Sequence, residues 1–221
     1  LRAIRAFSFT ASIIPVVLAA FLALSQGAPV RWGLFLPVLA GAVLLHAGTN
    51  LVSDAADFRR GVDRKGTLGG SGVLVAGLLT PRQVFRDGIV LLGAGAAIGL
   101  FLVWTSGAPV LWIGLAGVIG GFFYGGRSFG YKYWALGDAA VFLLMGPLLV
   151  LGPYFVLTGS FHSHALLLSL PVGCLVTAIL SSNNMRDIRH DAEAGVRTLA
   201  TILGFGAAKA QYALLVAGAY V

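Results

Sequence analysis

The sequence predicts an all-α bundle of transmembrane helices, and three observations support this prediction. Of the 221 residues, 58% are hydrophobic and only 10% are charged, whereas about 25% of the residues in an average soluble domain are charged. The apolar residues form seven long stretches rather than the period-two alternation of membrane strands. The basic residues gather almost entirely in every second loop. An ordinary water-soluble protein is therefore excluded.

Each apolar stretch has about the length of a membrane-crossing helix, which needs about 20 mostly apolar residues. Helices satisfy their own backbone hydrogen bonds in lipid, so a helical bundle is favoured. The 31 glycines suit close helix packing in a membrane. In order along the chain, the expected helices cover residues 6–25, 32–52, 83–104, 108–125, 138–158, 164–182 and 203–221.

Local signals refine several of these elements. The first stretch is too long in its apolar part for a cleavable signal peptide, and no small-residue cleavage site follows Gln26. Thr80 and Pro81 are the residue types preferred at the N-cap and the first position of a helix, so we expect the third helix to begin there. The second and sixth stretches run directly into polar segments. We expect the second helix to continue to about residue 58.

The chain is expected to form one domain over residues 1–221. No polar or Pro/Ser-rich stretch is long enough to act as an interdomain linker. The last apolar stretch is still running at Val221, so we expect the domain to be incomplete at its C-terminus. The single cysteine, Cys174, excludes an intramolecular disulfide.

The charges predict an orientation in the membrane. With a cytoplasmic N-terminus, only Arg31 falls on the far side, which follows the positive-inside rule. The cytoplasmic basic residues would be Arg2, Arg5, Arg59, Arg60, Arg64, Lys65, Arg82, Arg86, Arg127, Lys132, Arg186, Arg189, Arg197 and Lys209. All eight acidic residues fall on this side too, although a topology signal needs only cations. Because the net charge of +7 lies in loops between apolar segments, it does not indicate a nucleic-acid partner.

The second apolar stretch ends in a cluster of polar residues. If the helix continues to about residue 58, Asn50, Asp54 and Asp57 lie at positions i, i+4 and i+7 and share one face. His46 extends this face by one turn. A lone histidine on an apolar helix is more often a packed or hydrogen-bonded residue, so both interpretations of His46 stay open.

The sixth apolar stretch ends in a similar cluster. Asn183, Asp187 and Asp191 lie at positions i, i+4 and i+8 and again form one stripe, with Asn184 and Arg186 beside them. Both clusters begin with an amide, continue with two carboxylates and are followed by a glycine. Since both also fall on the same side of the membrane, we expect the two helices to face each other.

The two clusters together predict a Mg²⁺-diphosphate site. Converging carboxylates repel one another, so a positive group is expected among them. Mg²⁺ commonly takes one or two carboxylates together with waters and substrate phosphates. Surrounding arginines and lysines would contact the remaining phosphate oxygens. The alternative is that these residues pair in surface loops and anchor the helix ends at lipid headgroups.

At these residues the chain resembles the UbiA superfamily of intramembrane prenyltransferases. The second cluster, with the segment that follows it to Gly204, looks like the branch that prenylates 1,4-dihydroxy-2-naphthoate in menaquinone biosynthesis. Residues 5–15, 77–84 and 142–152 agree with the same resemblance, which runs over nearly the whole chain.

The resemblance implies a bundle of nine helices, of which this chain holds about seven, around a cavity that opens sideways to lipid. It implies Mg²⁺ as cofactor, a prenyl diphosphate and an aromatic acceptor as substrates, and a prokaryotic inner membrane; it specifies no oligomeric state. By position, the catalytic and metal-binding residues would be Asp54, Asp57, Asp187 and Asp191, supported by Asn50 and Asn183. The diphosphate would face Arg5, Arg64, Lys65 and Arg186. Further cavity candidates are His46, Asp63, Tyr124, Lys132 and Asn184.

The implied reaction transfers a polyprenyl group to 1,4-dihydroxy-2-naphthoate with loss of CO2, giving demethylmenaquinol. The nearest alternative is the same chemistry on 4-hydroxybenzoate, homogentisate or a glycerol phosphate lipid. A cation-coupled transporter is a further alternative, but it predicts acids throughout the depth of the bilayer. Neither cluster has the spacing of a CDP-alcohol phosphotransferase.

Overall fold

The computed structural model describes residues 2–67, 69–125 and 130–220, so Arg127 and Val221, both named above, lie outside the described residues. Within these ranges the chain is helical and has no strand, which confirms the predicted fold class. The α-helices are α1 (Thr10–Ser25), α2 (Phe35–Arg60), α3 (Pro81–Ser106), α4 (Ala108–Tyr124), α5 (Gly137–Leu143), α6 (Leu149–Thr158), α7 (Ser163–Glu193) and α8 (Leu199–Gly218). A π-helical segment, η4 (Leu144–Leu148), joins α5 to α6.

The described part of the chain contains 6 helical segments that are long and apolar enough to cross a membrane. One of them, Gly137–Thr158, combines α5, η4 and α6. The shorter α4, with 17 residues, is apolar as well. These segments and α4 correspond in order to the predicted apolar stretches. The protein is therefore an integral, multi-pass membrane protein.

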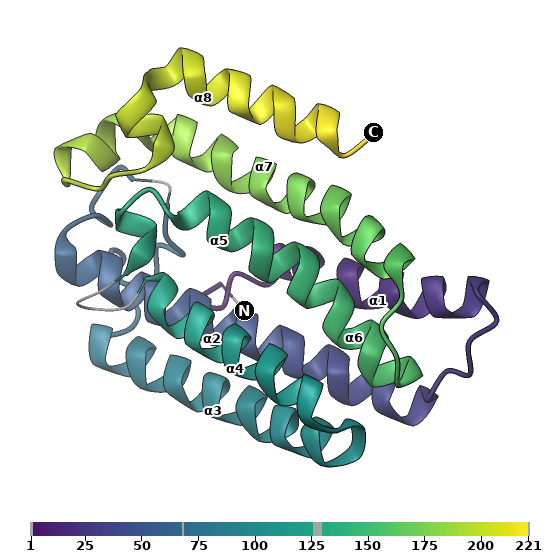
Figure 1. Cartoon of the computed structure of the whole chain (residues 1–221). Coiled ribbons are helices and arrows are strands. Elements are labelled where there is room, and N and C mark those ends of the chain that lie inside the picture. Colours follow the sequence, from purple (N-terminus) through teal and green to yellow (C-terminus); the bar gives the residue numbers. More distant parts are fainter. Residues whose placement is uncertain (1, 68, 126–129, 221) are drawn as a thin grey trace.

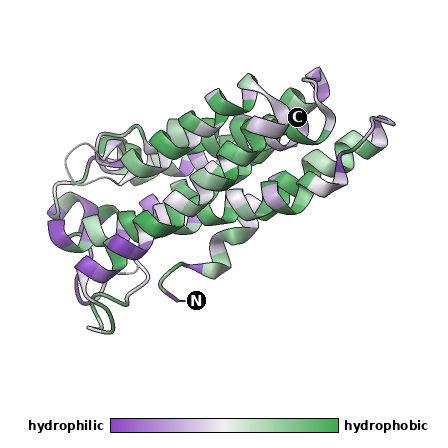
Figure 2. Ribbon diagram, turned by 90° about the horizontal axis from the view of Figure 1, so that it is seen from below, coloured by the Kyte–Doolittle hydropathy of each residue, from purple (hydrophilic) through white to green (hydrophobic). Residues whose placement is uncertain are grey.

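The helices lie side by side in one bundle (Figure 1). Neighbouring pairs include α2 with α3, α7 with α8, and α1 with α6. Hydrophilic residues gather at one end of the bundle, whereas the helices along its length are mostly hydrophobic (Figure 2). The C-terminal ends of α2 and α7 both lie at this polar end.

The two helices that carry the aspartate clusters continue past their apolar stretches. Helix α2 runs to Arg60 and ends at Gly61, whose φ of 73° lies in the left-handed region that glycine adopts without strain. Helix α7 runs to Glu193. At the start of α3, Thr80 and Gln83 form a reciprocal capping box and Pro81 follows, which confirms the predicted start.

The segment between α2 and α3 is held on the bundle by its own apolar side chains. Val73 and Leu74 are buried together with Leu51 and Ala55 of α2 and Val84 of α3. Burial of a side chain of this size stabilises a fold by about 1.5–3 kcal/mol. This anchor keeps the residues just before it beside the C-terminal half of α2.

The backbones of η4 and α7 pack closely at a pair of glycines. A Cβ atom on Gly146 would lie 2.6 Å from the Cα atom of Gly173 and 2.9 Å from the carbonyl oxygen of Ser169. Backbone atoms cannot turn aside as a flexible side chain can, so the two segments would have to separate. Small residues permit this kind of close approach between membrane helices.

Gly146→Ala is therefore expected to destabilise the protein by about 1–3 kcal/mol, because the added methyl group overpacks this contact. The melting temperature in detergent should fall. Gly93→Ala in α3 is the matched control, since a Cβ atom there meets nothing within 4 Å. Its melting temperature should stay the same or rise, because alanine forms helix better than glycine. Equal melting temperatures for Gly146→Ala and the native protein would contradict the described packing.

Candidate active site

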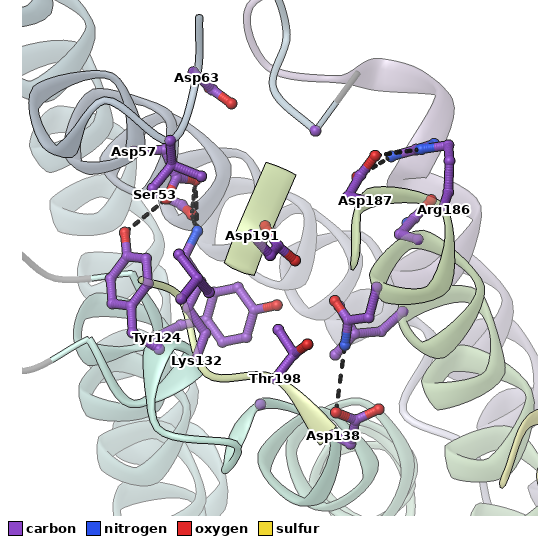
Figure 3. Close-up of a pocket in the computed structure, with 18 of the residues that line it drawn as sticks. Ser53, Asp57, Asp63, Tyr124, Lys132, Asp138, Arg186, Asp187, Asp191 and Thr198 are labelled. Atoms are coloured by element: carbon purple, nitrogen blue, oxygen red, sulfur yellow. Dashed lines mark hydrogen bonds and ion pairs between the residues drawn. The ribbon is translucent and has the colours of Figure 1, made fainter. Parts of the chain in front are cut away.

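A pocket at the polar end of the bundle brings the two aspartate clusters together (Figure 3). Asp57 of α2 lies on one side, Asp187 of α7 lies on the other, and Asp191 of α7 lies between them. The predicted site residues that line it are Arg5, Asn50, Asp57, Asp63, Tyr124, Lys132, Asn183, Asn184, Arg186, Asp187 and Asp191. The helices α2 and α7 thus face each other across this pocket, as the spacing of their polar residues predicted.

Asp54 lies next to the pocket but is itself only 1% exposed. Its carboxylate forms an ion pair with the guanidinium of Arg5 and accepts a hydrogen bond from the backbone N–H of Ser71 at 2.9 Å. Ser71 immediately precedes the apolar anchor between α2 and α3. Because Arg5 lines the pocket, the buried Asp54 carboxylate holds a cation at the pocket wall.

Asp57 is held by a cation and a hydroxyl from the segment before α5. Its Oδ2 lies 2.5 Å from Nζ of Lys132, and its Oδ1 accepts a hydrogen bond from the hydroxyl of Tyr133 at 2.6 Å. Burial, and after it the Asp57 carboxylate, raise the pKa of Tyr133, so this hydroxyl keeps its proton. Lys132 also donates to Oγ of Ser53 at 2.6 Å.

The segment that carries Lys132 is tied to the segment that follows α7. The backbone N–H of Ala135 donates to the carbonyl oxygen of Arg197 at 2.6 Å, and the N–H of Arg197 donates to the carbonyl oxygen of Tyr133 at 3.3 Å. Trp134 and Arg197 form an isolated parallel bridge. Main-chain hydrogen bonds therefore join the segment before α5 to the segment after α7 beside the pocket.

On the opposite wall, Asp187 accepts hydrogen bonds from Nε and Nη2 of Arg186, at 2.9 and 2.6 Å. The Arg186 side chain stays 42% exposed, so part of its guanidinium is open to a ligand. Asp191 lies between the two walls (Figure 3) and has no ion-pair partner within the described ranges. Its negative charge is available to a cation in the pocket.

Some predicted residues lie elsewhere. Arg64 forms an ion pair with Glu193 and lines a neighbouring pocket, together with Arg2 and the Asp63 that both pockets share. Lys65 is exposed and lines neither of these two pockets. His46 lies outside both as well.

The pocket also contains residues that the sequence analysis did not single out as site residues: Ser53, Tyr133, Asp138 and Thr198. Asp138 is buried at the start of α5 and accepts hydrogen bonds from Asn184 at 3.4 Å and from Gln211 of α8 at 3.1 Å. The position of Asp138 at the very start of an apolar stretch could have identified it as a site residue, because ionisable groups at membrane depth are commonly functional.

The donor set of the pocket suits a hard divalent cation. Five aspartates line the pocket, against the three cations Arg5, Lys132 and Arg186. Burial, and after it the carboxylates of Asp57 and Asp54, raise the pKa of Asp63 to about 7. Among the described residues, no group of three or more His, Cys, Asp or Glu is arranged to hold a metal ion. Carboxylate oxygen is nevertheless the ligand type that Mg²⁺ prefers, and this ion commonly takes one or two carboxylates together with waters and substrate phosphates.

Comparison with known proteins places the chain in a family. The sequence profile of the UbiA prenyltransferase family matches residues 12–221. The chain is 35% identical over 205 residues to UbiA prenyltransferase domain-containing protein 1 of Rattus norvegicus, an alignment that covers 91% of this chain and 60% of that protein. It is 31% identical over 217 residues to 1,4-dihydroxy-2-naphthoate octaprenyltransferase of Bacillus subtilis, which covers 98% of this chain and 70% of that protein. The chain thus spans about 60% of the length of the rat relative. It belongs to the UbiA prenyltransferase family.

Proposed function

We propose that the protein is a Mg²⁺-dependent membrane prenyltransferase that transfers a polyprenyl group from a prenyl diphosphate to 1,4-dihydroxy-2-naphthoate. The observation that carries the proposal is that carboxylates from α2 and α7 line the same pocket as Arg5, Lys132 and Arg186. Membership of the family supports the reaction class. The name of the Bacillus subtilis relative supports the choice of acceptor.

In this proposal the charged residues bind the diphosphate end of the donor. Asp57, Asp187 and Asp191 would hold Mg²⁺, and Asn183 would support them; the bound metal would neutralise charge that develops on the diphosphate. Asp54, which is buried next to the pocket, would act through its ion pair with Arg5. Asn50 would support the metal-binding carboxylates. Arg5 and Arg186 would donate to phosphate oxygens that the metal leaves free. Arg64 and Lys65 would attract the anion from the adjoining polar surface.

The remainder of the reaction would take place where the pocket meets the apolar bundle. The bond between the allylic carbon and the diphosphate oxygen breaks, and its electron pair leaves with the diphosphate. The electron-rich ring of the acceptor then forms a bond to the allylic carbon and releases its carboxylate as CO2. Exclusion of water by the apolar helices protects the prenyl cation from hydrolysis. The diphosphate end of the donor therefore needs polar surroundings, and its prenyl chain needs apolar ones.

The basic loops support an orientation with the polar end and its pocket on the cytoplasmic side. A prokaryotic inner membrane is the proposed location, since the naphthoate relative is bacterial. A cation-coupled transporter is disfavoured, because five of the eight acidic residues line one pocket at the polar end, whereas a path for cations predicts acids throughout the depth of the bilayer.

The acceptor is tested by incubating purified protein with one prenyl diphosphate, Mg²⁺ and a panel of acceptors. The panel contains 1,4-dihydroxy-2-naphthoate, 4-hydroxybenzoate, homogentisate and a glycerol phosphate lipid. Mass spectrometry should detect a decarboxylated, prenylated naphthoquinol. Transfer to another acceptor without turnover of the naphthoate would replace the proposed substrate.

Removal of the metal is expected to stop the reaction. Addition of EDTA should reduce product formation to the background level, and excess Mg²⁺ should restore it, because the pocket cations alone leave the charge on the departing diphosphate only partly neutralised. Full activity in EDTA would contradict the proposed cofactor.

A further inference from the structure

Arg5 adopts an unfavourable backbone conformation at the pocket wall. Its φ of 53° and ψ of 52° lie in the left-handed region, and among the described residues only Arg5 and Ala135 are non-glycine residues with positive φ. Such conformations persist only where surrounding contacts enforce them, and they cluster at functional sites.

Side chains fix the peptide groups on both sides of Arg5. The amide nitrogen of Asn50 donates to the carbonyl oxygen of Ile4 at 3.2 Å. The hydroxyl and the backbone N–H of Ser8 both donate to the carbonyl oxygen of Arg5, each at 2.8 Å. Because each peptide group is planar, fixing the groups before and after a Cα atom fixes its φ and ψ. Asn50 and Ser8 are also linked, since the same Asn50 nitrogen lies 3.3 Å from Oγ of Ser8.

His46 supports this arrangement from behind. Its Nε2 lies 3.2 Å from Oγ of Ser8, and its Nδ1 lies 2.7 Å from Oγ of the buried Ser12. Since the Ser8 hydroxyl already donates to Arg5, it accepts from His46, which places the imidazole hydrogen on Nε2. Nδ1 then accepts from Ser12. Phe9 packs edge-on against the ring, with centroids 5.6 Å apart.

One stripe of α2 therefore holds both the main chain and the side chain of Arg5. His46, Asn50 and Asp54 lie at positions i, i+4 and i+8, on one helix face. The first two act on the backbone around Arg5, and the third pairs with its guanidinium. The Nε atom of Arg5 is buried and has no hydrogen-bond partner in the described part of the chain, so the guanidinium keeps an unused donor.

We infer that Ser8, backed by His46, is a positioning residue that holds Arg5 in its left-handed conformation and so directs its guanidinium to the diphosphate of the donor substrate. The inference rests on the proposed function, because it takes the diphosphate as the ligand of Arg5. Ser8 itself does not line the pocket. Loss of its hydroxyl removes one of the two hydrogen bonds that Ser8 makes to the Arg5 carbonyl, and with it the links from Ser8 to Asn50 and His46 of α2. The bond that remains, from the Ser8 backbone N–H, does not tie Arg5 to α2, so the backbone can relax away from the strained conformation.

The test compares Ser8→Ala with Ser8→Thr, which restores a hydroxyl. Ser169→Ala is the matched control. Ser169 is buried in α7, its hydroxyl donates to the carbonyl oxygen of Leu166 at 2.7 Å, and it does not line the pocket. Binding of farnesyl thiodiphosphate, an unreactive analogue, is measured with Mg²⁺, and steady-state kinetics are measured for both substrates.

Ser8→Ala should weaken analogue binding by about 5- to 10-fold, the effect of one hydrogen bond to a positioned group. The KM for the prenyl diphosphate should rise, whereas the KM for the acceptor should not change. Ser8→Thr should recover most of the affinity, and Ser169→Ala should bind as the native protein does. In an Arg5→Gln background, Ser8→Ala should cause no further loss, because its effect passes through Arg5.

A full additional loss in the Arg5→Gln background would overturn the inference, as would native analogue binding by Ser8→Ala. A native protein that binds the thiodiphosphate but transfers no prenyl group would instead defeat the proposed function. In that case the Ser8 and Arg5 binding measurements still decide the positioning role.

Discussion

Asp187→Asn is expected to lower prenyl transfer by at least about 100-fold, the scale of effect seen when a group that stabilises developing charge is removed. Asp187 lines the pocket on α7, and its carboxylate is the proposed metal ligand opposite α2. Asparagine keeps the size of the side chain but removes the charge. The fold should survive, because the partner Arg186 is 42% exposed and stays solvated without its carboxylate. Product formation at saturating substrate and the Mg²⁺ concentration for half-maximal rate measure the effect.

The chain offers a close control in Asp87→Asn. Asp87 pairs with the preceding residue, Arg86, just as Asp187 pairs with Arg186, and it also falls on the basic side of the predicted topology. Asp87 lines neither of the two pockets described above. Its variant should keep native activity. Equal activity of the two variants would contradict a role of Asp187 in the metal site, because loss of its negative charge would then have no effect on the reaction.

Lys132→Met is expected to have two effects, on stability and on activity. Lys132 and Asp57 form an ion pair in which the side chains are 17% and 9% exposed. Removing one partner of a buried pair costs about 3–5 kcal/mol, because a charge is left without compensation; the pocket's access to water places this variant at the lower end. The melting temperature without Mg²⁺ should fall, and transfer should drop by at least about 10-fold as a pocket cation is lost.

The double variant Asp57→Asn/Lys132→Met separates the two effects. It has no unpaired buried charge at this position, so its melting temperature should recover most of the loss. Its activity should stay low, because both the proposed metal ligand and the cation are missing. Recovery of activity together with stability would mean that the ion pair serves the fold alone.

The helices and the convergence of the two clusters could be predicted because they follow from spacing. Apolar length determines a membrane span, and residues at i, i+4 and i+8 share a helix face whatever surrounds them. Asp57, Asp187 and Asp191 were therefore found from the sequence and lie in one pocket. The C-terminal ends of α2 and α7 were harder to predict, because their last turns are polar and apolar periodicity does not mark them.

The contributions of the loops could not be predicted in the same way. The backbone of a loop is set by contacts with distant residues, as at Ser71, which is placed by the buried Val73 and Leu74. Arg64 and Lys132 both looked like loop cations in the sequence, yet only Lys132 lines the pocket with the clusters, because its segment is bonded to Arg197. The partnership of Ser8, His46 and Asn50 likewise depends on how the N-terminal segment folds back on α2.

The hydrogen bonds between Ala135, Tyr133 and Arg197 also constrain how the protein can open. They hold the segment before α5 to the segment before α8, so these two segments cannot separate at the polar end without breaking main-chain hydrogen bonds. A long hydrocarbon substrate that enters sideways between helices would then pass these hydrogen bonds on their membrane side, at the depth of the lipid chains.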